Sequence, residues 1–130
     1  MGVRTLIVDD AEYMRQMLIM MLKKVHIDDI VQASNGEDAL KILEGGMINL
    51  VLLDCIMPKM DGLEVLKAIR ANPKIAKTPV ILVTGHADEH IISKARGPEY
   101  LADGIIAKPL SLATLEVKVA TVMSHHTKKG

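Results

Sequence analysis

The sequence predicts an α/β fold built around a parallel β-sheet, and three observations lead to this prediction. Short apolar runs recur along the chain, and a run such as 50–53 between polar residues is typical of a strand buried on both faces. Segments with the apolar spacing of helices alternate with these runs, as expected for parallel strands joined by right-handed helical crossovers. Finally, several runs end in a residue able to do chemistry, Asp54 above all.

The first strand is expected at 5–9, and a helix follows at 11–25 with two lysines in its last turn, where positive charge suits the helix dipole. Asp10 is a candidate cap for this helix. Its apolar stripe follows helical spacing and is best explained by core packing, although the surplus methionines suggest an adaptable docking surface. The stripe comprises Met14, Met17, Leu18, Met21 and Leu22.

The middle of the chain repeats the strand–helix pattern twice. A short strand at 30–33 and the turn Asn35–Gly36 precede an amphipathic helix at 37–44, which ends at two glycines. The central strand, 50–54, follows and delivers Asp54 to a loop rich in turn residues. The next helix is expected at 62–71, where an Asn-Pro pair breaks it.

Two further strand–helix units complete the prediction. A buried strand at 80–83 leads through Thr84-Gly85 to a short helix at 88–96, which Gly97–Pro98 ends. The fifth strand is expected at 104–107, and Ser111 is a plausible cap for a last helix reaching about Met123. We expect one domain with its core at about 3–123 and a polar, frayed tail at 124–130.

Composition excludes several classes of function. Basic and acidic residues number 16 each, which disfavours charge-driven binding to nucleic acid or to a membrane surface. The chain has two tyrosines, no phenylalanine and no tryptophan, so platforms for stacking bases are nearly excluded. No apolar run approaches the length of a membrane span, and a single cysteine is compatible with a reducing compartment. We therefore expect a cytoplasmic protein.

The residues that follow the predicted strands form a coherent set. Asp9, Asp10, Asp54, Thr84 and Lys108 all lie at carboxyl ends of strands, which meet at one edge of a parallel sheet. Clustered carboxylates repel one another, and a divalent cation such as Mg²⁺ together with the lysine would relieve this repulsion. Such a site suits a phosphoryl group, with Asp54 as the nucleophile that becomes an aspartyl phosphate.

This ordered set resembles the response-regulator receiver domain of two-component signalling, and the resemblance covers about residues 3–123. It implies a doubly wound, flavodoxin-like fold with five parallel strands in the order 2-1-3-4-5 and helices on both faces. The motifs that carry it are Asp9-Asp10, Asp54, Met57-Pro58, Asp61-Gly62, Thr84 and Lys108-Pro109.

The resemblance implies a role for each matching acidic residue. Asp54 is expected to be the phosphoacceptor. Asp10 and Asp54 are expected to ligate Mg²⁺ directly, with the backbone carbonyl of Ile56 as a third ligand, whereas Asp9 would act mostly through water. No other cofactor is expected.

The resemblance also implies how the phosphoryl group is held and read. Lys108 would pair with it, and the Lys108–Pro109 bond is similar to one that is cis in the family. Thr84 would hydrogen-bond a phosphoryl oxygen. The expected phosphodonor is a histidine kinase or a phosphotransfer protein, docking near the first helix, and the expected output is binding to another protein by a monomer.

The chain departs from the family at positions that matter for output. Position 105, three before the lysine, carries isoleucine where many members have an aromatic residue that couples to the threonine. The segment 84–108 is slightly longer than usual. Ile56 and His86 occupy positions that tune hydrolysis of the aspartyl phosphate in the family, and their effects are expected to oppose each other.

Three functional hypotheses remain open at this point. The first is a stand-alone regulator whose binding to a partner is switched by phosphorylation. The second is a phosphorelay intermediate or a phosphate sink, which Ile105 favours. The third, a Mg²⁺-dependent phosphatase, is disfavoured because that class usually has a carboxylate two residues after the nucleophile, where this chain has Ile56. A receiver that no longer takes phosphate is disfavoured because no site residue is missing.

Overall fold

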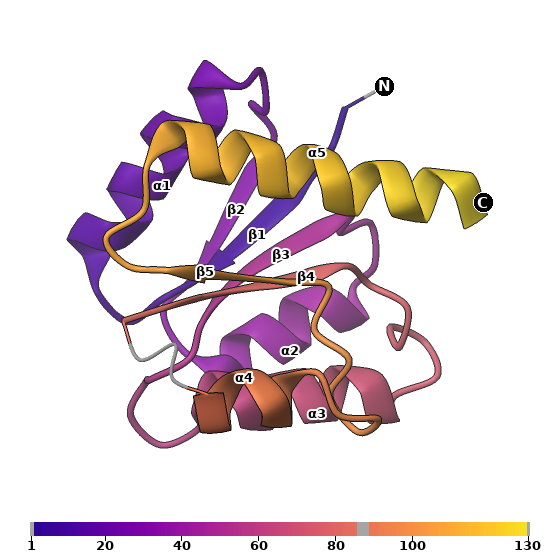
Figure 1. Ribbon diagram of the computed structural model, residues 1–130. Helices are drawn as coiled ribbons and strands as arrows, with labels where there is room; N and C mark the ends of the chain where they lie inside the picture. Colours follow the sequence, from indigo (N-terminus) through magenta and orange to yellow (C-terminus); the bar gives the residue numbers. More distant parts are fainter. Residues whose placement is uncertain (1, 86–88, 130) are drawn as a thin grey trace.

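The computed structural model describes residues 2–85 and 89–129, with side chains through residue 125. The chain folds into a parallel five-stranded sheet that is covered by helices on both faces (Figure 1). The strands are β1 (Thr5–Val8), β2 (Ile30–Ala33), β3 (Leu50–Asp54), β4 (Val80–Thr84) and β5 (Gly104–Ala107). The helices are α1 (Glu12–Lys24), α2 (Gly36–Glu44), α3 (Gly62–Ala71), α4 (Glu89–Ala95) and α5 (Leu112–Lys129).

Strand order and direction agree with the expected doubly wound topology. The order is β2-β1-β3-β4-β5, and every neighbouring pair is parallel. Helices α1 and α5 cover one face of the sheet, and α2, α3 and α4 cover the other (Figure 1). Because β1, β3 and β4 are buried along their whole lengths, their sequences are continuous apolar runs rather than alternating ones.

Each face of the sheet has its own hydrophobic core. The core under α1 and α5 includes Leu18 and Leu22 of the predicted stripe, and Leu115 from α5. The core on the opposite face is built around α2 and α3, with Leu66 and Ile69 fully buried. Among the described residues no helix is both long and apolar enough to cross a lipid bilayer.

Two boundaries near the amino terminus differ from the sequence prediction. Strand β1 ends at Val8, so Asp9 lies in the loop that follows. Helix α1 starts at Glu12 with Ala11 at the N-cap and without a side-chain cap, so the prediction that Asp10 caps it was wrong. The reason is that Asp9 takes this place, because its Oδ1 accepts a hydrogen bond from the Ala11 amide at 2.9 Å.

Local capping explains where the middle helices begin. Helix α2 starts one residue earlier than predicted, at Gly36, because the Asn35 side chain accepts a hydrogen bond from the Asp38 amide and acts as its N-cap. Helix α3 has the predicted bounds. It opens on a capping box, in which Asp61 and Glu64 each accept the other's backbone amide at 2.9 and 3.2 Å.

The last third of the chain holds the remaining differences. Helix α4 covers Glu89–Ala95, so its predicted start at 88 lies outside the described residues, as does His86. Between α4 and β5, the segment 97–103 is turn and loop. Ser111 caps α5 as predicted, accepting the Thr114 amide at 3.1 Å, but the helix runs to Lys129 because 124–129 contain neither proline nor glycine.

Candidate functional site

The register of the sheet brings the predicted site residues to one edge. Val8 pairs with Leu53, so Asp9 and Asp54 follow neighbouring paired positions of β1 and β3. Thr84 at the end of β4 is paired with Ala107 at the end of β5, directly before Lys108. All of these residues therefore lie at the carboxyl edge of the parallel sheet, where ligands of such folds bind.

Three carboxylates meet at this edge. Asp9, Asp10 and Asp54 each offer an oxygen that lies within 4.8 Å of the others. Asp9 and Asp54 are buried, whereas Asp10 is exposed. The Lys108 ammonium bridges the two buried acids, donating to Asp9 Oδ2 at 3.3 Å and to Asp54 Oδ1 at 3.2 Å. The structure thus brings together four of the predicted residues around one point.

In the part of the chain that the structure describes, the cluster has more acidic than basic groups, with three carboxylates and the single ammonium of Lys108. Burial raises the pKa of Asp54 above its ordinary value of 3.8, and the neighbouring Asp9 carboxylate raises it further. Lys108 lowers this pKa in part, as does the backbone amide of Ile56. Burial would lower the pKa of the Lys108 ammonium, but the attraction of Asp54 and Asp9 outweighs it and the pKa is raised. The ammonium therefore stays charged and only partly compensates the acids.

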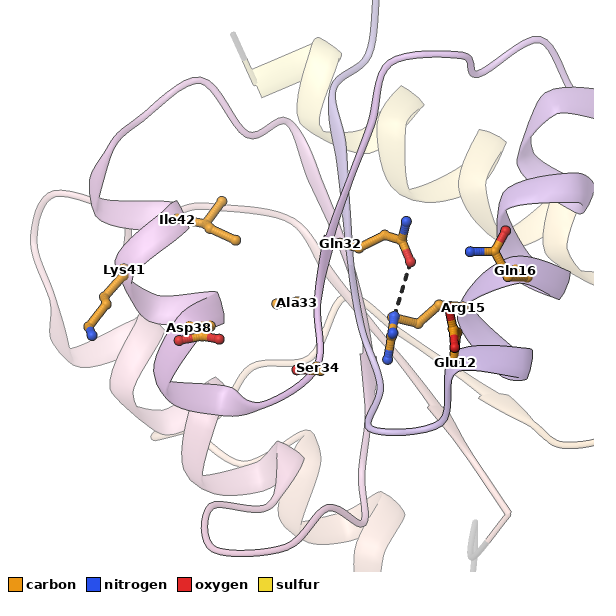
Figure 2. Close-up of a pocket in the computed structure, with 9 residues that line it drawn as sticks. All are labelled: Glu12, Arg15, Gln16, Gln32, Ala33, Ser34, Asp38, Lys41 and Ile42. Carbon is orange, nitrogen blue, oxygen red and sulfur yellow. Dashed lines mark hydrogen bonds between the residues drawn. The ribbon is translucent and has the colours of Figure 1, made fainter.

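The loop that carries the acidic pair is fixed by contacts that the sequence did not indicate. The Asp9 amide donates to the Ala33 carbonyl at 3.2 Å. Its own carbonyl accepts Arg15 Nη1 from α1 at 2.8 Å, and Arg15 Nε donates to Gln32 Oε1 at 3.0 Å. Figure 2 shows the Arg15–Gln32 contact beside an open groove of about 500 Å³ between α1, β2 and α2.

The loop after β3 is shaped by Gly62, another residue whose contribution the sequence motif did not explain. A Cβ atom at this position would collide with the Asp54 carbonyl and lie 2.8 Å from Cys55 Cα. The Gly62 amide donates to the Cys55 carbonyl at 2.8 Å and closes the loop over the end of β3. Glycine is therefore required sterically for α3 to begin this close to the phosphoacceptor candidate. The Ile56 side chain is exposed at this loop.

The remaining predicted features lie at the ends of β4 and β5 and within β5. Thr84 is fully buried, and its carbonyl accepts the Lys108 amide at 2.8 Å, which joins β4 to the loop after β5. The Lys108–Pro109 peptide bond is cis, as the resemblance implied. Ile105 is half-buried and packs against the core under α2 and α3.

The residues present fit a hard divalent cation. All of the side-chain ligands that the cluster offers are carboxylate oxygens, which Mg²⁺ prefers, and three of them converge. The raised pKa of Asp54 reflects repulsion from Asp9 in addition to burial, and a divalent cation among these oxygens would relieve that repulsion.

A doubly wound parallel sheet that presents an acidic triad and a lysine at its carboxyl edge defines a signalling receiver module. The chain belongs to the response regulator receiver domain family, which residues 5–120 match. The predicted family and fold are therefore confirmed, and the chain is a two-component response regulator by its receiver domain.

Single-domain chemotaxis regulators are among its relatives. The chain is 35% identical over 119 residues to the chemotaxis protein CheY-3 of Vibrio cholerae, covering 91% of this chain and 89% of that protein. It is 32% identical over 120 residues to a probable chemotaxis protein CheY of Rhizobium etli, covering 92% of each.

Solved structures give the same picture. The CheY4 structure of Vibrio cholerae matches with a TM-score of 0.85 at 25% identity, covering 94% of this chain and 99% of that one. A receiver domain of an HD domain-containing protein from Pseudomonas fluorescens matches with a TM-score of 0.88 at 26% identity, covering 98% and 99%. The feature shared with these structures is the receiver fold.

Proposed function

We propose that this protein is a response regulator that accepts a phosphoryl group on Asp54 from a histidine kinase or phosphotransfer protein and thereby switches its binding to another protein. One observation carries the proposal: three carboxylates and the Lys108 ammonium converge at the carboxyl edge of the sheet. A structural ion pair alone does not need three clustered acids, whereas phosphoryl transfer needs a carboxylate nucleophile beside a lysine and a site for a metal cation.

Each residue has a distinct part in the proposed reaction. An oxygen of the Asp54 carboxylate attacks the phosphorus, and the bond from phosphorus to the donor nitrogen breaks. Lys108, already in contact with Asp54, stabilises the charge on the phosphoryl oxygens, and the buried Thr84 hydroxyl donates to one of them. Asp9, Asp10, Asp54 and the Ile56 carbonyl would hold Mg²⁺, which supplies charge neutralisation when bound.

The output is a shift between conformations of the loops after β3 and β4 and of helix α4. Moving such an equilibrium from 1:99 to 99:1 takes about 5.5 kcal/mol, which several charge-assisted hydrogen bonds to a phosphoryl group can supply. We propose that the protein acts as a single cytoplasmic domain and as a monomer. Its phosphodonor docks near α1, where Tyr13 and Met20 are 76% and 63% exposed.

Intact-mass measurement with acetyl phosphate and Mg²⁺ tests the proposal. The parent protein is expected to gain the mass of one phosphoryl group, and omission of Mg²⁺ or the Asp54→Asn substitution is expected to abolish the gain. Asp28→Asn is the matched control, because Asp28 is exposed before β2 at the opposite edge of the sheet, and it should react like the parent. An unchanged mass in the parent protein would refute the proposal.

A second candidate, a phosphorelay intermediate or phosphate sink, is favoured by Ile105. This side chain is half-buried against the core and has no aromatic ring to report phosphorylation on the surface of β5. A pull-down that retains a partner only with the phosphorylated protein supports the switch, whereas rapid loss of phosphate with no such partner supports the sink. Turnover of phosphate esters is not expected, because Ile56 stands where a phosphatase would place its acid–base carboxylate.

A further inference from the structure

Arg15 connects the acidic loop to the edge of the sheet through two separate nitrogens. Nη1 donates to the Asp9 carbonyl at 2.8 Å, and Nε donates to Gln32 Oε1 on β2 at 3.0 Å. Figure 2 shows the Arg15 side chain reaching from α1 to Gln32 across one side of the groove. Because the guanidinium is planar, these two contacts fix its orientation as well as its position.

The Asp9 carbonyl belongs to the same planar peptide unit as the Asp10 amide. A contact that holds the carbonyl therefore fixes the orientation of the whole peptide plane between Asp9 and Asp10. The carboxylate of Asp9 is held independently, by the Ala11 amide at 2.9 Å and by Lys108 at 3.3 Å. Arg15 thus adds a restraint that acts on Asp10, the exposed member of the triad.

Asp10 depends on its backbone for its position. Its side chain is exposed, and α1 begins at Glu12, with Ala11 at the N-cap and without the side-chain cap that would tie an aspartate to the helix. The oxygens of the triad must nevertheless stay close together to share one cation. Groups behind metal ligands that fix ligand orientation commonly change metal affinity about 10-fold or more when they are removed.

We infer that Arg15 is a positioning residue of the cation site, which it serves by fixing the Asp9–Asp10 peptide through the Asp9 carbonyl. This inference rests on the proposed function, because it assumes that the acidic triad binds Mg²⁺. It assigns to Arg15 a role in cation affinity that a simple tie between α1 and β2 would not have.

Calorimetric titration of metal-free protein with Mg²⁺ tests the inference. Arg15→Ala is expected to weaken Mg²⁺ binding about 10-fold. Arg15→Lys is expected to recover part of the affinity, because an ammonium can reach the Asp9 carbonyl but cannot also hold Gln32. Arg4→Ala is the matched control: Arg4 contacts Asp29 at 3.1 Å and links the residues just before β1 and β2, at the opposite edge of the sheet. Its Mg²⁺ affinity should equal that of the parent.

A metal-free measurement supplies an independent result. The backbone amide resonance of Asp10 should move in Arg15→Ala and stay in place in Arg4→Ala, since only the first change releases the Asp9–Asp10 peptide. If Arg15→Ala folds poorly, the Gln32→Leu variant is used in its place. Gln32→Leu keeps Arg15 but removes the side-chain oxygen that orients the guanidinium. Weaker Mg²⁺ binding in this variant supports the inference.

The outcomes separate the inference from the proposed function. Parental Mg²⁺ affinity in Arg15→Ala, or in Gln32→Leu where that variant is used, overturns the role of Arg15 and leaves phosphorylation of Asp54 untouched. Failure of the parent protein to bind Mg²⁺ overturns both. Equal losses in Arg15→Ala and Arg4→Ala would also overturn the inference, because they would trace the effect to the strand pair as a whole.

Discussion

Two basic side chains meet acids at opposite edges of the sheet, and they do so in different ways. Arg70 at the end of α3 donates five hydrogen bonds of 2.6–3.1 Å, one of them to Asp103. Among the described residues, the Lys108 ammonium contacts two side chains, at 3.2 and 3.3 Å, and both are carboxylates, Asp54 and Asp9. The other four acceptors of Arg70 are the backbone carbonyls of Ala76, Thr78, Tyr100 and Leu101.

The difference separates a structural site from a reactive one. A guanidinium has five N–H donors, so the contacts of Arg70 use its whole capacity. They fix two segments of backbone, 76–78 and 100–101, and the side chain of Asp103. Burial lowers the pKa of Arg70, and the single carboxylate of Asp103 offsets this in part. Lys108 is a rotatable point charge shared between two buried acids. Its ammonium can therefore turn toward a phosphoryl group without releasing any backbone segment that it holds in place.

The largest predicted effect on stability is therefore at Arg70. Arg70→Ala leaves Asp103 without its cation and four carbonyls without their donor, and we expect a loss of about 3–5 kcal/mol in the free energy of unfolding. Urea denaturation measures this loss. Lys67→Ala is the control on the same helix, because its pair with Glu99 is exposed, and it should leave the denaturation midpoint almost unchanged. Equal midpoints for the two variants would contradict the comparison.

An intermediate effect is predicted at Lys108. Lys108→Ala leaves two buried carboxylates without their ammonium, and we expect a loss of about 1–3 kcal/mol at neutral pH. Because protonated carboxyls need no cation, the loss should shrink as the pH falls through the raised pKa of Asp54. Urea denaturation across acidic and neutral pH measures it, with the exposed Lys74→Ala as control. A loss that is constant with pH would argue against a charge effect.

The smallest predicted effect has the opposite sign. Because the pKa of Asp54 is raised by folding above 3.8, its ionisation costs folding free energy at neutral pH. Asp54→Asn should therefore raise the melting temperature at neutral pH, and the gain should vanish below pH 3.8, where the carboxyl is protonated in both states. Asp28→Asn is the control, because Asp28 is exposed at the opposite edge of the sheet. Destabilisation by Asp54→Asn at neutral pH would show that the acid is held mainly for stability.

The contrast between the two basic residues also explains what the sequence could predict. Asp54 is the last residue of a strand and Lys108 directly follows one, and strand ends can be located from apolar runs and turn residues. Their convergence then follows from parallel topology alone. The family resemblance added the strand order and the cis bond at Lys108–Pro109, both of which the structure has.

Arg15 and Arg70 could not be predicted in the same way. Their acceptors are mostly backbone carbonyls and side chains far along the chain, such as Gln32 for Arg15 and Asp103 for Arg70. Every residue has a backbone carbonyl, so the sequence does not identify these acceptors. Nothing in the sequence therefore distinguishes these arginines from solvent-exposed ones. The wrong cap predicted for α1 has a related cause. β1 ends one residue earlier than predicted, and Asp9 rather than Asp10 therefore contacts the start of the helix.

The most direct test of the central claim is to locate the phosphoryl group by residue. The protein is treated with acetyl phosphate and Mg²⁺, the acyl phosphate is reduced with borohydride, and peptides are sequenced by mass spectrometry. The modification is predicted on Asp54 alone, beside the Lys108 ammonium. A modification on Asp9, Asp10 or a residue outside the edge cluster, with Asp54 unmodified, would contradict the account.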